Sequence, residues 1–133
     1  MRQKPALTSS DAHKMMAACK AEAAKNKWNV AIAIVDDAGA ALLLERLDGA
    51  GPIVSEVAMG KARTAALTRR PTKYFEDRVK ERPAFVTFPT PSVMFQGGLP
   101  LIYQGDCVGA IGVSGVQSHE DEQIAQAGVA LLG

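Results

Sequence analysis

The chain opens with a polar stretch, and a helical pattern of apolar positions follows it. From position 12 onwards these residues recur at spacings of three, four and seven and form one stripe: Ala12, Met15, Met16, Cys19 and Ala23. The residues at 8–10 (Thr, Ser, Ser) are N-cap candidates, and Asp11 suits the positive end of a helix. The pattern predicts a helix that starts here and ends near Asn26.

Two strand patterns come next. Residues 28–35 are apolar on both pleat faces, which predicts a central strand covered on both sides. Asp37-Ala38-Gly39 is typical of a turn, and residues 41–47 fit a returning strand. Together these segments predict a β-hairpin.

The middle of the chain favours helices. Pro52 suits a helix start, because its missing N–H is not needed there. An alanine-rich face that includes Lys61 follows, and it indicates close packing on a sheet. Thr72 is a candidate cap for a short polar helix over 73–81. Prolines then predict a loop with at most a short strand around 85–88.

The last part of the chain predicts a second hairpin and a final helix. Residues 101–104 and 107–114 flank a Gly105-Asp106 turn, and Ser118-x-x-Asp121 resembles a capping box. The predicted order is α-β-β-α-α-(β)-β-β-α. Paired hairpins with helices between them predict an antiparallel sheet in a single α+β domain over residues 1–133.

Composition and charge exclude several classes of protein. The 133 residues carry a net charge of +1 with interspersed signs, so nucleic acid is not an expected partner. Hydrophobic residues make up 47% but aromatic residues only 5%, whereas haem pockets usually supply rings. Cys19 and Cys107 form no CxxC pair, which argues against zinc or a disulfide framework. No apolar stretch is long enough for a membrane span, and the first residues lack a secretory apolar region, so we expect a cytoplasmic protein.

Only two histidines are available for chemistry. His13 flanks the apolar stripe of the first helix, where it is either an axial iron ligand or a boundary residue with a solvated ring. His119 and Glu122 have the i, i+3 spacing of a divalent metal pair, although acidic residues in a first helical turn also suit the helix dipole.

Two cations and a glycine pair could bind an anion. Lys61 lies on the inner helix face, so its ammonium must reach a charge partner or an anionic ligand. Arg46 shares a strand face with Asp48 and could form an ion pair or bind a ligand. Gly97 and Gly98 could present backbone N–H groups to an anion, although two glycines are a weak signal.

Several segments taken in order resemble one protein family. They are VAIAIVDDAG at 30–39, LERLDGA at 44–50, Ser55, KARTA at 61–65, GGLP at 97–100, GAIGVSG at 109–115, and Asp121-Glu122 with Ala125 and Ala127-Gly128. The ordered set resembles the GlcG/HbpS-like family, or haem-degrading domain family, which includes the C-terminal domain of some corrinoid adenosyltransferases. The resemblance covers essentially the whole chain.

The resemblance implies a fold, an assembly and a ligand. It implies a profilin-like antiparallel sheet of about five strands flanked by helices, assembled into homo-oligomers of two or more copies. Haem is the implied cofactor, with His13 as the candidate iron ligand because a first-helix histidine has been implicated in haem-binding relatives. The residues expected at the ligand site follow from the resemblance and from the anion-binding pattern: Arg46, Ser55, Lys61, Gly97, Gly98 and Pro100.

Three functions remain open from the sequence. The first is binding of haem or another tetrapyrrole, with Lys61 or Arg46 at the propionates. The second is a small catabolic enzyme that isomerises, hydrates or hydrolyses a carboxylated metabolite, with the Gly97-Gly98 amides near an oxyanion. Its general base would be one of four residues: Asp36, Asp37, Glu56 or His13. The third is a chaperone-like or scaffolding subunit without a small ligand.

Overall fold

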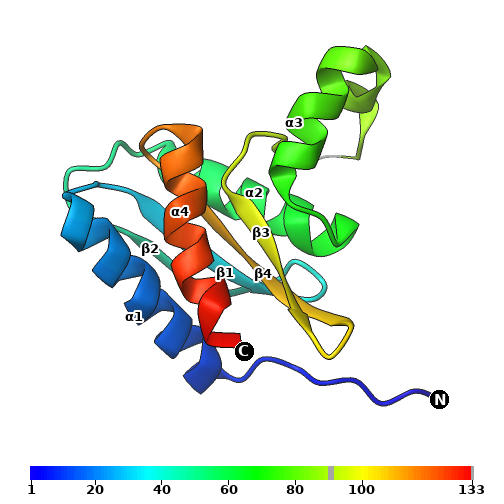
Figure 1. Ribbon diagram of the computed structural model, residues 1–133, viewed down its shortest axis with the longest axis horizontal. Helices are drawn as coiled ribbons and strands as arrows, with labels where there is room; N and C mark the ends of the chain where they lie inside the picture. Colours follow the sequence, from blue (N-terminus) through cyan, green and yellow to red (C-terminus); the bar gives the residue numbers. More distant parts are fainter. Residues whose placement is uncertain (90–91, 133) are drawn as a thin grey trace.

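The computed structural model describes residues 1–89 and 92–132. Its elements follow in chain order (Figure 1): α1 (Ser9–Asn26), β1 (Ala31–Asp36), β2 (Ala41–Arg46), α2 (Val54–Thr68), α3 (Thr72–Glu81), the 3₁₀ helix η1 (Pro83–Thr87), β3 (Gly98–Tyr103), β4 (Asp106–Ser114), α4 (Ser118–Val129) and the 3₁₀ helix η2 (Ala130–Leu132). The predicted α+β class is confirmed. Within the described ranges, no helix is long and apolar enough to cross a bilayer.

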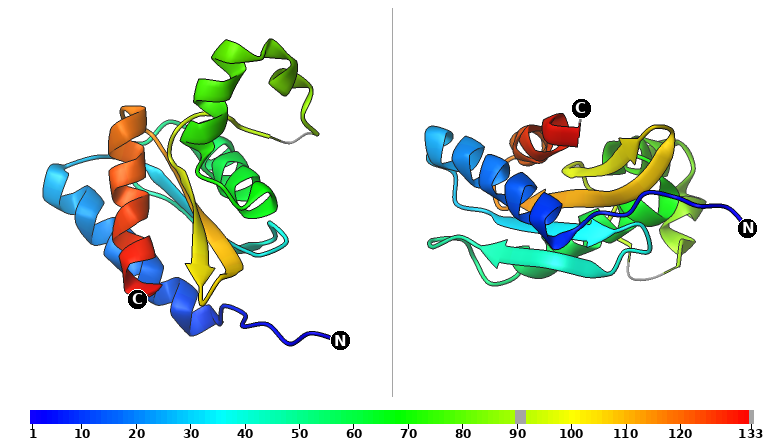
Figure 2. Two further views of the ribbon diagram at one scale, coloured as in Figure 1. Left: turned by 45° about the vertical axis from the view of Figure 1, so that its right-hand side comes forward. Right: turned by 90° about the horizontal axis from the view of Figure 1, so that it is seen from below.

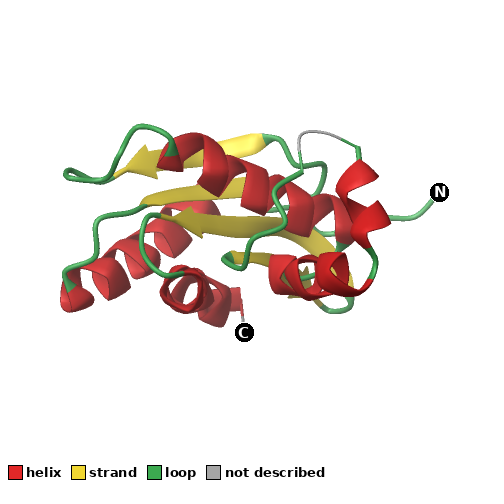
Figure 3. Ribbon diagram, turned by 90° about the horizontal axis from the view of Figure 1, so that it is seen from above, coloured by secondary structure: helices red, strands yellow, loops and turns green. Residues whose placement is uncertain are grey.

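The sheet is antiparallel and has the order β2-β1-β4-β3. Helices cover both of its faces, so it forms the middle layer of three (Figure 3). Residues 31–35 of β1 are fully buried, as their apolar character on both pleat faces predicts. The central position of β1 follows from its pairing with β2 on one side and β4 on the other.

The prediction of about five strands is wrong by one, because the described residues form four. Of the segment expected to hold a short strand, residues 85–87 lie instead in η1, and Phe88 directly follows it. Two residues of the segment, Phe85 and Phe88, pack on Phe75 of α3 with ring centroids 6.1 and 5.3 Å away. Both rings therefore lie on the same side of the segment, which an alternating strand would not allow. The α3–η1 unit projects from the rest of the fold (Figure 2).

The two faces of the sheet have different cores. Beneath α1 and α4 the core consists of larger side chains, including Met15, Ile32 and Ile111. Beneath α2 it is almost entirely alanine and valine, with Ala58 and Ala62 fully buried. This helix lies very close to β4, since a Cβ at Gly112 would be only 2.1 Å from the Ala58 carbonyl oxygen. The alanine-rich pattern thus predicted the close packing correctly.

Helix caps differ in part from prediction. Thr8 caps α1 as expected and forms a capping box with Asp11. At α4, however, the N-cap is Gln117, and Glu120 completes the box. Thr72 is the first residue of α3 and does not cap it, because its hydroxyl accepts a hydrogen bond from the Gly98 N–H at 2.9 Å. The α2 helix begins at Val54, two residues beyond the predicted start.

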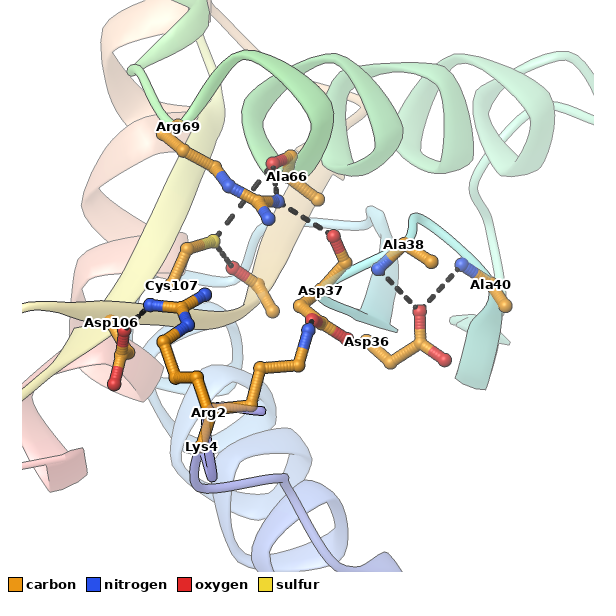
Figure 4. A network of polar contacts seen from close by, with 11 residues as sticks. Arg2, Lys4, Asp36, Asp37, Ala38, Ala40, Ala66, Arg69, Asp106 and Cys107 are labelled. Carbon is orange, nitrogen blue, oxygen red and sulfur yellow. Dashed lines mark hydrogen bonds and ion pairs between the residues drawn. The ribbon is translucent and has the colours of Figure 1, made fainter.

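The N-terminal segment connects the two hairpin turns through ion pairs (Figure 4). Arg2 contacts Asp106, the first residue of β4 after the β3–β4 turn, at 3.1 Å, and Lys4 contacts Asp37 of the β1–β2 turn. These contacts keep residues before α1 close to the sheet end where the hairpins turn.

Candidate functional site

Lys61 lies in the interior of the protein, and its ammonium has protein partners. Its Nζ donates to the Val113 carbonyl oxygen at 2.9 Å and forms an ion pair with Asp121 Oδ2 at 3.1 Å. Lys61 and Asp121 are each only 2% exposed. The contacts join α2, β4 and α4. Of the two alternatives that the sequence left open for Lys61, the structure shows the charge partner.

The predicted glycine pair packs directly against this ion pair. A Cβ at Gly97, whose φ is +133°, would lie 2.8 Å from Lys61 Nζ, and one at Gly98 would lie 2.5 Å from the Lys61 carbonyl oxygen. The Gly98 N–H donates to the Thr72 hydroxyl. The structure therefore brings Lys61, Gly97 and Gly98 together, as the sequence indicated. However, the Lys61 ammonium and the Gly98 N–H already have hydrogen-bond partners within the chain.

Asp121 is the member of this cluster that the sequence prediction missed. Besides Lys61, its carboxylate accepts a hydrogen bond from the Val116 N–H at 3.1 Å. Burial raises the pKa of Asp121 above its ordinary value, although Lys61 and the Val116 N–H oppose that shift. One signal could have identified it, since Asp121 shares a helical stripe with the buried residues Ile124, Ala125 and Gly128.

Three other predicted site residues lie apart from the Lys61 cluster. Arg46 is exposed at the end of β2, opposite Ala31 in the register. Pro100 is half-buried in β3 and pairs with Ala110. Ser55 lies in the first turn of α2 and lines a groove on the outer side of that helix. A role for these residues in ligand binding stays a prediction.

His13 has the arrangement of a free metal ligand. The residue is exposed on α1, and its Nδ1 lies 2.8 Å from the Ser9 carbonyl oxygen. A carbonyl oxygen can only accept, so Nδ1 carries a proton, and in the neutral ring the lone pair lies on Nε2. Iron-ligating and zinc-ligating histidines are commonly oriented by such a bond from the other ring nitrogen. The residues present at this position therefore fit an axial ligand to haem iron.

The described part of the chain holds no group of three or more His, Cys, Asp or Glu residues able to surround a metal ion. His119 is exposed, and its predicted partner Glu122 accepts a hydrogen bond from Gln96 Nε2 at 3.1 Å. Burial raises the pKa of Cys19 to about 12, which keeps that thiol protonated. Among the predicted iron and metal ligands, His13 is the one whose surroundings favour ligation.

Comparison with known proteins identifies a family and a close sequence relative of the chain. The family described as "Haem degrading protein HbpS-like" matches residues 7–130. Protein GlcG of Escherichia coli (strain K12) is 44% identical over 115 residues, which cover 86% of this chain and 85% of GlcG.

Two solved structures are similar over almost the full length. A double mutant of HbpS from Streptomyces reticuli is 36% identical with a TM-score of 0.92, and the match covers 100% of this chain and 91% of that one. A PduOC:heme complex is 29% identical with a TM-score of 0.88 and coverages of 95% and 94%.

Proposed function

The chain belongs to the HbpS-like family of haem-degrading proteins, and from this premise we propose that it binds haem as its ligand. One solved relative, PduOC, was crystallised as a complex with haem. The observation in this chain that carries the proposal is the orientation of His13, whose Nδ1 is held by the Ser9 carbonyl oxygen while the ring is exposed.

In this proposal His13 would hold the haem iron through Nε2. The hydrogen bond to Ser9 selects the neutral tautomer with its lone pair on Nε2 and fixes the ring relative to α1. Both effects favour binding of ferric iron, because the free nitrogen would be Nε2 and the ring needs no new orientation. Haem bound there would supply a redox-active iron, and this chain would supply its position.

An exposed ligand leaves most of a haem surface in contact with water. His13 does not line any of four grooves that the described residues form. We therefore propose that a second copy of the chain covers the haem, so that the working particle is a homo-oligomer of two or more copies. Burial of the apolar macrocycle between copies would provide the driving force that a single surface lacks.

The same assembly could provide the propionate contacts. Ala31 pairs with Arg46 at the end of the sheet where α1 finishes, whereas His13 lies near the start of α1. His13 and Arg46 of one chain therefore lie towards opposite ends of the sheet, and we assign Arg46 to propionates held by a neighbouring copy. The unpaired thiols of Cys19 and Cys107 fit a reducing, cytoplasmic location.

Titration with haemin tests the proposal. The wild-type chain should show a saturable shift of the Soret band, and His13→Ala should weaken binding by at least about tenfold, as loss of an axial ligand would do. His119→Ala is the matched control, because His119 is also an exposed histidine on a helix, and it should bind as the wild type does.

Two outcomes would contradict the proposal. Absence of a Soret shift would remove haem as the ligand, and equal binding by the wild type and His13→Ala would remove His13 as the ligand to iron. Sedimentation velocity with and without haemin tests the assembly, and a monomer in both samples would contradict the homo-oligomer.

A further inference from the structure

A groove runs along the outer side of α2, and we call it the α2 groove. It has a volume of about 450 Å³, within the range of small-molecule sites. Its walls are mostly apolar and come from β2, from α2 and from the segment after residue 91: Leu44, Ile53, Val57, Met59 and Val93. Its polar lining includes Ser55, Glu56 and Arg63.

The wall at Val93 is held in place by specific contacts. The Val93 N–H donates to the Thr64 hydroxyl at 2.9 Å, and that hydroxyl donates in turn to the Gly60 carbonyl oxygen at 2.9 Å. Thr64 is 3% exposed. A Cβ at Gly60 would lie only 2.3 Å from Val93 Cγ2, so the glycine is needed for Val93 to lie against α2. The groove is therefore a fixed feature of the fold.

Arg63 lines this groove without an acidic partner among the described residues. Its side chain is half-buried, and its Nε is buried without a hydrogen-bond partner. A guanidinium without an acidic partner can bind a carboxylate strongly through two parallel hydrogen bonds.

Two apolar side chains of the groove walls are also exposed to solvent. Leu44 is 47% exposed and Ile53 is 64% exposed, although both line the groove. Apolar area next to an unpaired guanidinium suits a ligand that has a hydrocarbon part and an anionic group. Glu56 lies in the same groove and would repel a second negative charge.

We propose that the α2 groove binds a small amphipathic monocarboxylate, an organic acid with an apolar body. The carboxylate pairs with the Arg63 guanidinium, and the hydrocarbon part lies against Leu44, Ile53 and Met59. This site is separate from the haem proposal, because the groove is lined by α2 and β2 and contains no histidine.

Octanoate is a suitable probe, with two matched comparison ligands. Octan-1-ol has the same hydrocarbon chain without the charge, and octanedioate adds a second carboxylate. Isothermal titration calorimetry should show that octanoate binds at least about tenfold more tightly than either comparison ligand, because one loses the charge-assisted pair and the other meets Glu56.

Variants of the groove locate the site. Arg63→Met should reduce octanoate affinity by about tenfold or more, and Arg63→Lys should give an intermediate loss, since an ammonium keeps the charge without the planar fork. Arg70→Met is the control, because Arg70 is exposed and does not line the groove, and it should bind octanoate as the wild type does. Glu56→Gln should raise the affinity for octanedioate severalfold.

The proposal is overturned if octanoate does not bind at millimolar concentration, or if Arg63→Met binds it as tightly as the wild type. Circular dichroism melting of each variant shows whether the fold is intact, and amide chemical-shift changes confined to α2 and β2 would confirm the location. Haemin added at saturation should not displace octanoate, so failure of the haem proposal would leave this result unchanged.

Discussion

Lys61 and Arg63 are cations two positions apart on the same helix, and they lie in opposite environments. Lys61 is 2% exposed and pairs with Asp121, whereas Arg63 lines a surface groove and its Nε has no partner. Two residues correspond to about 200° of rotation around a helix, which separates the inner face of α2 from its outer face. The inner cation must be paired inside the fold, and the outer one remains able to bind a ligand.

Lys61→Met should produce the largest effect. The substitution leaves the Asp121 carboxylate buried beside the Val116 N–H alone, so the free energy of unfolding should fall by about 3–5 kcal/mol. Urea denaturation at neutral pH measures this change. The double variant Lys61→Met/Asp121→Leu removes both charges and should recover much of the loss. A loss below about 1 kcal/mol for the single variant would show that Lys61 is not a structural residue.

Gly98→Ala should have the next largest effect. The added Cβ would lie 2.5 Å from the Lys61 carbonyl oxygen and 2.8 Å from Thr72 Cγ2, so the backbone must shift. We expect a loss of about 1–3 kcal/mol in the same denaturation assay. Gly51→Ala is the control, because a Cβ there meets nothing within 4 Å. Equal stability of the two variants would contradict the close packing of β3 against α2.

The stability of the fold at low pH tests the surface carboxylate of Asp11, in contrast to the buried carboxylate of Asp121. The pKa of Asp11 is lowered mainly by the backbone N–H of Thr8 and then by the Thr8 hydroxyl. Because the folded-state pKa lies below the unfolded value, the stabilisation is complete above the ordinary pKa of Asp and is lost as pH falls through the lowered value. Asp11→Asn should therefore flatten the decline of the melting temperature between about pH 5 and about pH 2. An unchanged slope would rule out this contribution of the capping box.

Arg63→Met should have the smallest effect on stability. The substitution removes a buried donor that has no partner, so the free energy of unfolding should fall by no more than about 0.5 kcal/mol. The comparison with Lys61→Met is direct, since the introduced residue and the helix are the same. A loss as large as that of Lys61→Met would mean that Arg63 has a structural partner.

Hydrophobic periodicity predicted most of the fold. It placed α1, the first hairpin and the alanine-rich face of α2 correctly, because each depends on local spacing of apolar residues. It also predicted the second hairpin, although β3 begins at Gly98, three residues before the predicted strand. It failed around 85–88, where the position of Phe85 and Phe88 is decided by Phe75, a residue distant in sequence. A tertiary contact of that kind leaves no local signal.

The candidate sites were less predictable for a related reason. The sequence identified Lys61 as a buried cation but could not choose between a ligand and a protein partner, since Asp121 is 60 positions away and also fits a capping box. Arg63 lies in the KARTA segment, but that segment gives it no ligand-binding role, and its importance depends on Val93 and Thr64 closing a groove around it. His13 was predicted as a candidate, and the Ser9 contact gives a physical reason for it.

The electron paramagnetic resonance spectrum of the ferric haem complex tests the role of His13 most directly. The wild-type spectrum should show nitrogen ligation of the iron. His13→Ala should lose that signature, and added imidazole should restore it by occupying the vacated position. A spectrum of His13→Ala identical to that of the wild type, without imidazole, would contradict the assignment of His13 as the ligand to haem iron.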